Sequence, residues 1–161
     1  MAARERAEPK TDVAADDVAA AGLVTQPLLV GTDCSGLESP LQALDNLKVR
    51  YRHVFSCESD AHLKKFISYN FKPEKYYDDI TTRDNSKTPY VDLYVAGFPC
   101  QPFSVAGHQH GFQDPKGRGT IVGHCIDYIK KQTPKMFILE NVKGFTTLKD
   151  GACHRAVIRH N

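Results

Sequence analysis

The pattern of apolar and polar positions becomes regular after Pro27, where short apolar runs alternate with segments of helical period. A short apolar run bounded by turn residues is typical of a buried strand, and apolar residues recurring every three or four positions are typical of a helix. The predicted strands cover 28–32, 51–58, 75–80, 91–97 and 135–141. The predicted helices cover 38–47, 60–71 and 120–132. Strands that alternate with helices predict an α/β protein built on a parallel sheet with right-handed crossovers.

The first predicted helix has a clear apolar face, because Leu41, Leu44 and Leu47 recur at helical spacing. We expect Ser39 to cap its N-terminus and Pro40 to lie in its first turn.

The two ends of the chain give weaker patterns. Residues 1–26 are rich in alanine and carry three basic and five acidic side chains, which predicts a flexible tail and disfavours an organelle transit peptide. Residues from Lys143 onward are rich in turn and basic residues, and we expect no further strand there.

Composition limits the class of protein without naming it. The chain has 161 residues, enough for one domain, and its net charge of +2 neither identifies nor excludes a nucleic-acid partner. Its five cysteines are odd in number, widely spaced and free of any CxxC, which favours reduced thiols in an intracellular protein. The sequence predicts no metal site and no membrane span, because it lacks a zinc-ligand spacing and a long apolar run.

The candidate functional residues lie at the carboxyl ends of the predicted strands. Ligands of parallel α/β sheets bind beyond the carboxyl ends of the strands, and those ends meet at one edge of the sheet. The residues there are Gly36, Glu58, Asp79, Cys100, Glu140 and Asn141. Any one strand-end acid can equally be a solvated or capping residue, so the convergence of all these positions carries the prediction.

The stretch "VAGFPCQPFSVAG" places Cys100 between Pro99 and Pro102. Prolines fix their own φ angles and restrict the residues before them, which aims the thiol of Cys100. A cysteine alone is more often a small buried hydrophobe, but Glu140 ends the next predicted strand and is expected beside it. A nucleophilic thiol next to a buried carboxylate, oriented by Asn141, favours covalent catalysis on a heterocycle.

The earlier strand ends suit a nucleoside-type ligand. Glu58 ends a strand shortly after a first βα unit, where an acid can accept hydrogen bonds from ribose hydroxyls. The turn "DCSGLES" can bring backbone N–H groups close to a ligand, with Gly36 allowing the approach. Asp79 can accept from an adenine amino group. The turn is not a GxGxxG, so a dinucleotide is a weak interpretation.

"GFPCQPFS" with "ENV" after the next helix closely resembles the C5-cytosine DNA methyltransferases, and the likeness runs from about Leu28 to Leu148. "SCESD" and "YDDI" look like the family's second and third cofactor motifs, and "GFQDPKGRGT" looks like the loop segment before the helix. The resemblance implies a Rossmann-like methyltransferase sheet, S-adenosyl-L-methionine as cofactor, and a cytosine flipped out of DNA as substrate.

The resemblance also implies roles for individual residues. Cys100 attacks C6 of the cytosine, Glu140 holds N3 and the exocyclic amine, and Pro99, Gln101 and Asn141 set the loop geometry. The implied cofactor-binding residues are Asp33, Cys34, Ser35, Gly36, Leu37, Glu58, Ser59, Asp79, Ile80, Phe98 and Pro99.

Departures from the family pattern fall in two places. The family's first motif is usually F-x-G-x-G, but this chain has Cys34 in place of the aromatic residue and Glu38 in place of the second glycine. Glu38 adds a charge near the ligand. In the second motif, Ser59 replaces the aromatic residue that usually follows the ribose-binding acid. The Gln-x-Arg-x-Arg motif, the later strands and the target-recognition domain are absent. We therefore expect residues 27–161 to be a partial catalytic domain, incomplete at its C-terminus: a fragment, a chain of a split enzyme needing a second chain, or a degenerate paralogue.

Two alternatives stay open at this point. A tRNA cytosine-5 methyltransferase shares the same core, but that branch tends to carry Pro-Pro-Cys-Gln, and Phe98 favours DNA. A non-catalytic module would bind cofactor, DNA or a sister subunit. A cysteine protease is disfavoured, because no histidine is placed beside Cys100. The expected location is intracellular with the DNA, in the nucleus if the organism is a eukaryote. A sheet that stops at its fifth strand should leave an apolar edge uncovered.

Overall fold

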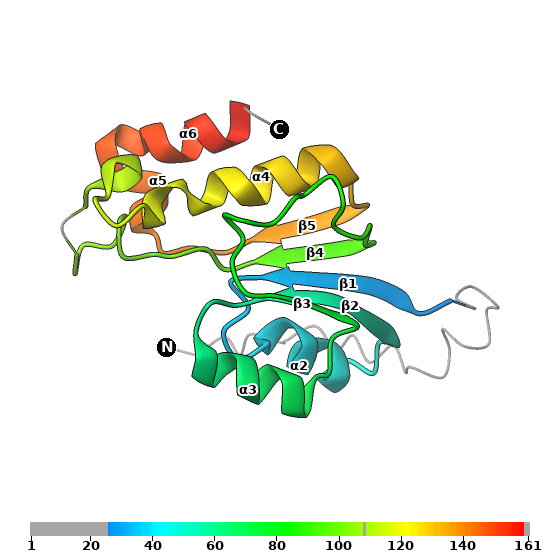
Figure 1. Ribbon diagram of the computed structural model, residues 1–161. Helices are drawn as coiled ribbons and strands as arrows, with labels where there is room; N and C mark the ends of the chain where they lie inside the picture. Colours follow the sequence, from blue (N-terminus) through cyan, green and yellow to red (C-terminus); the bar gives the residue numbers. More distant parts are fainter. Residues whose placement is uncertain (1–25, 108, 160–161) are drawn as a thin grey trace, which may run out of the picture.

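The computed structural model describes residues 26–107 and 109–159, and it contains a five-stranded parallel sheet with the order β3-β2-β1-β4-β5 (Figure 1). The strands are β1 (Leu28–Asp33), β2 (Tyr51–Cys57), β3 (Lys75–Tyr77), β4 (Leu93–Ala96) and β5 (Met136–Leu139). The helices are α2 (Ser39–Asn46), α3 (Ala61–Asn70), α4 (Ile121–Gln132), α5 (Gly144–Thr147) and α6 (Ala152–Arg159), with short 3-10 turns η1 (Gly111–Gln113), η2 (Arg118–Thr120) and η3 (Leu148–Gly151). The predicted α/β fold with a parallel sheet is confirmed.

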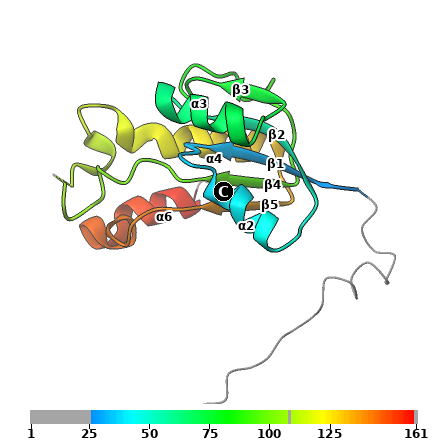
Figure 2. The ribbon, with the colours of Figure 1, turned by 90° about the horizontal axis from the view of Figure 1, so that it is seen from below.

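The strand order reverses between β1 and β4, which are neighbours in the sheet although β2 and β3 lie between them in the sequence. The chain first winds from β1 outward to β3 and then returns to place β4 and β5 on the other side of β1. Right-handed crossovers consequently put α2 and α3 on one face and α4 on the opposite face (Figures 1 and 2). Ligands of such sheets bind at this switch point, beyond the carboxyl ends of the strands.

The core has one cluster on each face of the sheet. The larger lies under α4, where Phe55, Tyr94 and Tyr128 are fully buried and their rings lie 4.5–6.5 Å apart. The smaller lies under α2 and joins the buried Val30 and Leu41. Burial of these large side chains is the main driving force that holds the strand ends in place.

Strand β5 forms an edge of the sheet whose side chains are exposed. Met136, Phe137 and Ile138 retain 52%, 42% and 54% of their accessible surface. The expected uncovered apolar edge is therefore present, because the helices pack elsewhere and leave both faces of β5 partly open.

Local details differ from the sequence predictions at both ends of the first helix. Glu38, not Ser39, is the N-cap of α2, and it holds a left-handed backbone with φ 56°. Leu47 lies beyond the end of the helix and is 71% exposed, whereas Leu41 is fully buried. The expected helical face therefore extends only as far as Leu44, which packs against the smaller cluster.

After Lys143 the described chain forms the helices α5 and α6 and the 3-10 turn η3. Helix α6 buries Cys153 and Val157, which lie four residues apart on one face, and it runs beside α4 (Figure 1). The predicted tail, residues 1–26, lies almost wholly outside the described residues.

Candidate active site

The segment after β4 presents Cys100 between two anchored aromatic residues. Phe98 and Phe103 are buried, whereas Cys100 between them is only partly buried. The carbonyl of Cys100 accepts hydrogen bonds from the backbone N–H groups of Phe103 and Ser104, both over 2.9 Å. These bonds close a tight turn directly after the cysteine, so the thiol is displayed on a rigid loop.

An aromatic cluster beneath this loop fixes its position. The rings of Phe98, Phe103 and Phe145 pack edge to face, with centroids 5.0–6.1 Å apart. Gly144 makes this approach possible, because a Cβ at that position would lie 2.1 Å from the carbonyl oxygen of Phe103. The start of α5 is thereby held against the loop that carries Cys100.

The segment after β5 joins the same loop. The backbone N–H of Glu140 donates to the carbonyl of Ala96 over 2.9 Å, and the side chain of Asn141 donates to the carbonyl of Phe98 over 2.8 Å. A Cβ on Gly97 would lie 3.5 Å from the Glu140 carboxylate and 3.8 Å from the carbonyl oxygen of Cys34. The Glu140 carboxylate therefore lies over the strand ends, between the loop of Cys100 and the turn after β1.

Glu140 is exposed, so the sequence expectation of a buried carboxylate is wrong for this structure. The physical reason is that β5 is an edge strand with open faces, and nothing among the described residues covers its carboxyl end.

The turn after β1 and the end of β2 form a second part of the site. The backbone N–H of Gly36 donates to Oε2 of Glu58 over 2.9 Å, and the N–H of Asp60 donates to Oε1 over 3.0 Å. The hydroxyl of Tyr76 donates to the carbonyl oxygen of Glu58 over 2.6 Å. Glu58 is therefore held rigidly beside the turn, while its carboxylate keeps lone pairs for a ligand.

Asp33 points into the core instead of toward the strand ends. Both guanidinium nitrogens of Arg83 donate to its carboxylate, over 2.5 and 2.7 Å, and the Tyr94 hydroxyl donates over 2.5 Å. Both charged side chains are essentially fully buried. Arg83 also lies over the rings of Phe55 and Tyr77. This ion pair ties the loop after β3 to the end of β1, and sequence reasoning missed it.

The segment after β3 carries Asp79 and Ile80 in different surroundings. Asp79 is exposed, and its Oδ1 accepts from the backbone N–H and the hydroxyl of Thr81, both over 2.8 Å. Ile80 is buried in the larger core cluster. Leu37 and Ser59, also expected near the cofactor, are exposed close to the turn and to Glu58.

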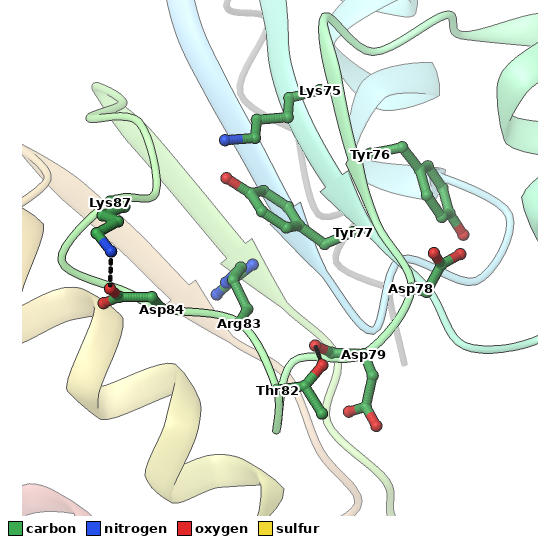
Figure 3. Close-up of a pocket in the computed structure, with 9 residues that line it drawn as sticks. All are labelled: Lys75, Tyr76, Tyr77, Asp78, Asp79, Thr82, Arg83, Asp84 and Lys87. Carbon is green, nitrogen blue, oxygen red and sulfur yellow. Dashed lines mark hydrogen bonds and ion pairs between the residues drawn. The ribbon is translucent and has the colours of Figure 1, made fainter.

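A cavity of about 360 Å³ lies along β3 and the loop that follows it. Figure 3 shows Lys75 and Tyr77 on one side of this cavity, Arg83 and Asp84 on the other, and Asp79 at one end. Neither Cys100 nor Glu140 lines it. This cavity therefore lies apart from the segments that carry Cys100 and Glu140.

A second cavity of about 330 Å³ lies next to the loop of Cys100. It is lined by Gln101, Gly107 and basic side chains that include Lys116 and Arg118. Arg118 pairs with Asp114, which accepts from its guanidinium over 2.7 Å. Sequence reasoning did not single out these basic residues, although their clustering in a glycine-bearing loop was a usable signal.

The remaining cysteines are poor nucleophiles. Burial raises the pKa of the Cys34 and Cys57 thiols well above their ordinary values, and burial raises the pKa of Cys125 to about 12. Because only a thiolate attacks, these three thiols stay unreactive at neutral pH. Cys153 is also buried, whereas Cys100 is only partly buried.

Two further findings concern residues 26–107 and 109–159. These residues contain no group of three or more His, Cys, Asp or Glu side chains placed to hold a metal ion. No helix in the same part of the chain is long and apolar enough to cross a membrane.

The solved structure of the S. pombe Dnmt2 methyltransferase has the same fold. It superposes with a TM-score of 0.63 at 21% sequence identity, covering 82% of this chain and 41% of that one. At this identity the likeness establishes the arrangement of strands and helices.

Sequence comparison gives the family. The chain is 43% identical over 106 residues to the type II methyltransferase M.NgoBI of Neisseria gonorrhoeae, covering 66% of this chain and 32% of that protein. It is 41% identical over 106 residues to the type II methyltransferase M.HaeII of Haemophilus aegyptius, with the same coverages of 66% and 32%. It is 40% identical over 112 residues to the orphan methyltransferase M.SPRI of Bacillus phage SPR, covering 68% of this chain and 25% of that protein.

The chain thus spans about a third or less of the length of these curated relatives. The family described as C-5 cytosine-specific DNA methylase matches residues 33–160, which include the turn after β1, the loop of Cys100 and the segment of Glu140. The chain therefore belongs to the C-5 cytosine-specific DNA methylase family.

Proposed function

We propose that the chain carries the reaction centre of a DNA cytosine-5 methyltransferase, which transfers a methyl group from S-adenosyl-L-methionine to C5 of cytosine. The observation that supports this most directly is that the segments carrying Cys100 and Glu140 follow the neighbouring strands β4 and β5 and are joined by the hydrogen bond from Asn141 to Phe98. The relatives named above are methyltransferases, and the family is defined by cytosine C5 chemistry.

The turn after β1 fits the cofactor. Gly36 has φ 54°, and nothing lies within 4 Å of the position that its Cβ would occupy, so the backbone is open to a ligand. We propose that this turn, with Ser35 and Leu37, holds the methionine end, and that Glu58 accepts from the ribose hydroxyls. The Asp33 carboxylate accepts hydrogen bonds from Arg83 inside the core, so we propose that Asp33 contributes to cofactor binding through its backbone.

The adenine end fits the segments that flank β2 and β3. Asp79 keeps an exposed carboxylate oxygen for the adenine amino group, and Ile80, buried in the larger core cluster, anchors the segment that carries it. Ser59 borders Glu58. We propose that Cys34 and Pro99 flank the approach to the reaction centre, while the buried Phe98 supports the loop of Cys100 from beneath. Bound S-adenosyl-L-methionine would supply an electrophilic methyl group at its sulfonium.

The side chains of this chain would then act on the cytosine ring. The Cys100 thiolate forms a bond to C6, and the electron pair of the C5–C6 double bond moves onto C5. Glu140 would form hydrogen bonds with N3 and the exocyclic amine, which would stabilise the adduct. After C5 has been methylated, loss of its proton to a base re-forms the double bond and expels the thiolate. Sulfur suits both steps, because it adds to the ring and leaves again.

The DNA partner follows from the position of the reacting atom. C5 and C6 of a stacked cytosine are beyond the reach of a thiol on a loop, so the base must leave the duplex. The basic side chains of Lys116 and Arg118 border the cavity beside Gln101, and we propose that they contact backbone phosphates. The reaction would take place where the cell keeps its DNA, in the nucleus if the organism is a eukaryote.

The exposed edge at β5 suits a further polypeptide segment. Met136, Phe137 and Ile138 are exposed, and an open strand edge pairs readily with another strand. We propose that a second chain, or a further part of a longer protein, adds to this edge, buries Glu140 and supplies the recognition of DNA sequence.

Methyl transfer tests the function. The full chain is incubated with labelled S-adenosyl-L-methionine and unmethylated duplex DNA, with tRNA in parallel. Each reaction is run alone and with the part of the Neisseria gonorrhoeae relative that this chain does not match. The proposal expects label on DNA as 5-methylcytosine and none with Cys100→Ser, while Cys153→Ser serves as the matched control. Label on tRNA alone, or label that survives Cys100→Ser, would contradict it.

A further inference from the structure

A buried acid lies at the start of α2. Glu38 is 0% exposed, and its Oε1 accepts hydrogen bonds from the hydroxyls of Thr32 and Ser56, over 2.9 and 2.7 Å. The Nε2 atom of His53 lies 3.5 Å from the same oxygen. Among the described residues, Oε2 of Glu38 and Nδ1 of His53 are the buried side-chain polar atoms that lack a hydrogen-bond partner.

This acid stands at the centre of a hydroxyl cluster that joins the turn after β1 to β2. The hydroxyl of Ser35 lies 3.1 Å from that of Thr32 and 2.8 Å from that of Ser56. It also donates to the carbonyl of Cys57 over 3.1 Å, and the Ser35 N–H donates to that carbonyl over 3.3 Å. Glu38 therefore ties together β1, the turn and the end of β2.

The next residues along both segments are the ones that face the cofactor in our proposal. Gly36 follows Ser35, Glu58 follows Cys57, and the N–H of Gly36 donates to Glu58 over 2.9 Å. The contacts around Glu38 thus join the turn to β2 inside the protein. The Gly36–Glu58 hydrogen bond joins the same two segments one residue further along.

The backbone of Glu38 would suit glycine better. Its φ of 56° and ψ of 39° are left-handed, a conformation that is strained for a residue with a side chain. Burial of a carboxyl group adds a further cost, and burial raises the pKa of Glu38 to about 7. A residue that is both strained and buried persists when the surrounding contacts over-determine it, as the hydroxyls of Thr32 and Ser56 do here.

We propose that Glu38 is a positioning residue that locks the turn after β1 against the end of β2, and so holds Gly36 and Glu58 in the geometry that receives the cofactor. This inference rests on the proposed use of that turn by S-adenosyl-L-methionine. Glu38 acts through the turn and does not itself touch the cofactor, since its side chain points between the strands.

Binding of S-adenosylhomocysteine to the full chain, measured by calorimetry, tests the inference. Glu38→Gly keeps the left-handed backbone and removes the carboxyl, so the dissociation constant should rise about tenfold or more. Glu38→Gln keeps the acceptor for both hydroxyls and should stay within about threefold of the parent chain. The matched control is Lys48→Gly, because Lys48 is exposed, has φ 57° and lies just beyond the other end of α2. It should leave binding unchanged.

Amide hydrogen exchange without cofactor provides a second readout. Exchange of residues 34–38 and 56–58 should be faster in Glu38→Gly and unchanged in Glu38→Gln and Lys48→Gly. Ser56→Ala removes one donor without altering the backbone, and it should show a smaller change in the same residues. If Glu38→Gly fails to fold, Ser56→Ala provides the test.

The outcomes separate this inference from the proposed function. Parent-like affinity and exchange in Glu38→Gly would overturn the role of Glu38. If the parent chain does not bind S-adenosylhomocysteine, the cofactor part of the proposed function fails, and exchange alone decides for Glu38. Faster exchange confined to the turn and the end of β2 then supports the positioning role, whereas unchanged exchange overturns it.

Discussion

The side-chain amide of Asn141 donates a hydrogen bond to the carbonyl of Phe98 over 2.8 Å, joining the segment after β5 to the segment after β4. The other end of the same amide accepts from the N–H of Val142 over 2.9 Å, which fixes its orientation. This bond fixes the position of the loop of Cys100 relative to the segment that carries Glu140.

Removing this bond should impair the reaction more than the fold. Asn141→Ala leaves a partly buried carbonyl without its partner, which should lower the free energy of unfolding by about 1–2 kcal/mol. A small displacement of the thiol should lower the single-turnover rate of methyl transfer by about a hundredfold. Urea denaturation and rapid-quench kinetics measure the two effects. Thr147→Ala, an exposed change nearby, is the control, and a parent-like rate in Asn141→Ala would contradict the clamp.

The buried ion pair of Asp33 and Arg83 should dominate the stability of the loop after β3. Arg83→Met leaves a buried carboxylate without its cation, and we expect a loss of about 3–5 kcal/mol. Asp33→Asn combined with Arg83→Met should recover part of that loss, because no charge then remains unpaired. Chemical denaturation of the single and double variants gives the coupling energy. Additive losses would show that the two side chains do not stabilise each other.

Glu38 should make the stability of the protein depend on pH. Burial raises its pKa from the ordinary 4.5 to about 7, so the folded chain holds this proton more tightly than the unfolded chain. The free energy of unfolding should therefore fall as the pH rises from about 4.5 to 7 and stay lower above pH 7. His53 opposes this trend at lower pH, because burial lowers its pKa from 6.5 to about 4. Its contribution is lost as the pH falls from about 6.5 to 4.

A comparison with Glu38→Gln isolates the contribution of Glu38, since His53 and the other groups that act on Glu38, namely Glu58, Tyr51 and Tyr76, remain in both proteins. The stability of the variant relative to the parent should grow by up to about 3 kcal/mol between pH 4.5 and 7.5. Denaturant unfolding at several pH values measures this difference. A constant difference would mean that Glu38 does not titrate in this range.

The edge at β5 should govern self-association of the isolated chain. Replacing exposed apolar side chains with lysine, as in Phe137→Lys and Ile138→Lys, should reduce association because charged edge strands resist pairing. Light scattering at increasing concentration measures the effect, with Lys135→Arg as a control that leaves the charge of the neighbouring surface unchanged. A parent chain that stays a stable, monodisperse monomer would contradict the exposed edge as an interaction surface.

The sequence was sufficient to predict the strands and their arrangement in a parallel sheet. Hydrophobic periods located all five strands, and the rules of parallel sheets predicted that the segments carrying Cys100 and Glu140 follow strands of one sheet, which are the neighbours β4 and β5. These predictions succeeded because periodicity and crossover handedness are local or topological properties.

Contacts made by tertiary packing were not accessible in this way. Asp33 and Arg83 lie 50 residues apart, and no spacing marks an arginine in a polar loop as the partner of a strand-end acid. Ser39 has the better capping propensity, but burial of the Glu38 carboxyl against Thr32 and Ser56 determined the start of α2. Helix α6 did leave a signal, because Cys153 and Val157 recur at helical spacing.

The proposed reaction depends on a covalent bond between the Cys100 thiolate and the cytosine ring, and this bond can be trapped. A duplex in which 5-fluorocytosine replaces cytosine cannot lose a proton from C5, so the adduct should persist after denaturation. Intact mass spectrometry of the chain with S-adenosyl-L-methionine, this duplex and the unmatched part of the Neisseria gonorrhoeae relative should show this chain linked to one DNA strand. The adduct should be absent in Cys100→Ser and present in Cys153→Ser. An adduct that persists in Cys100→Ser, or one that maps to another residue, would contradict the account.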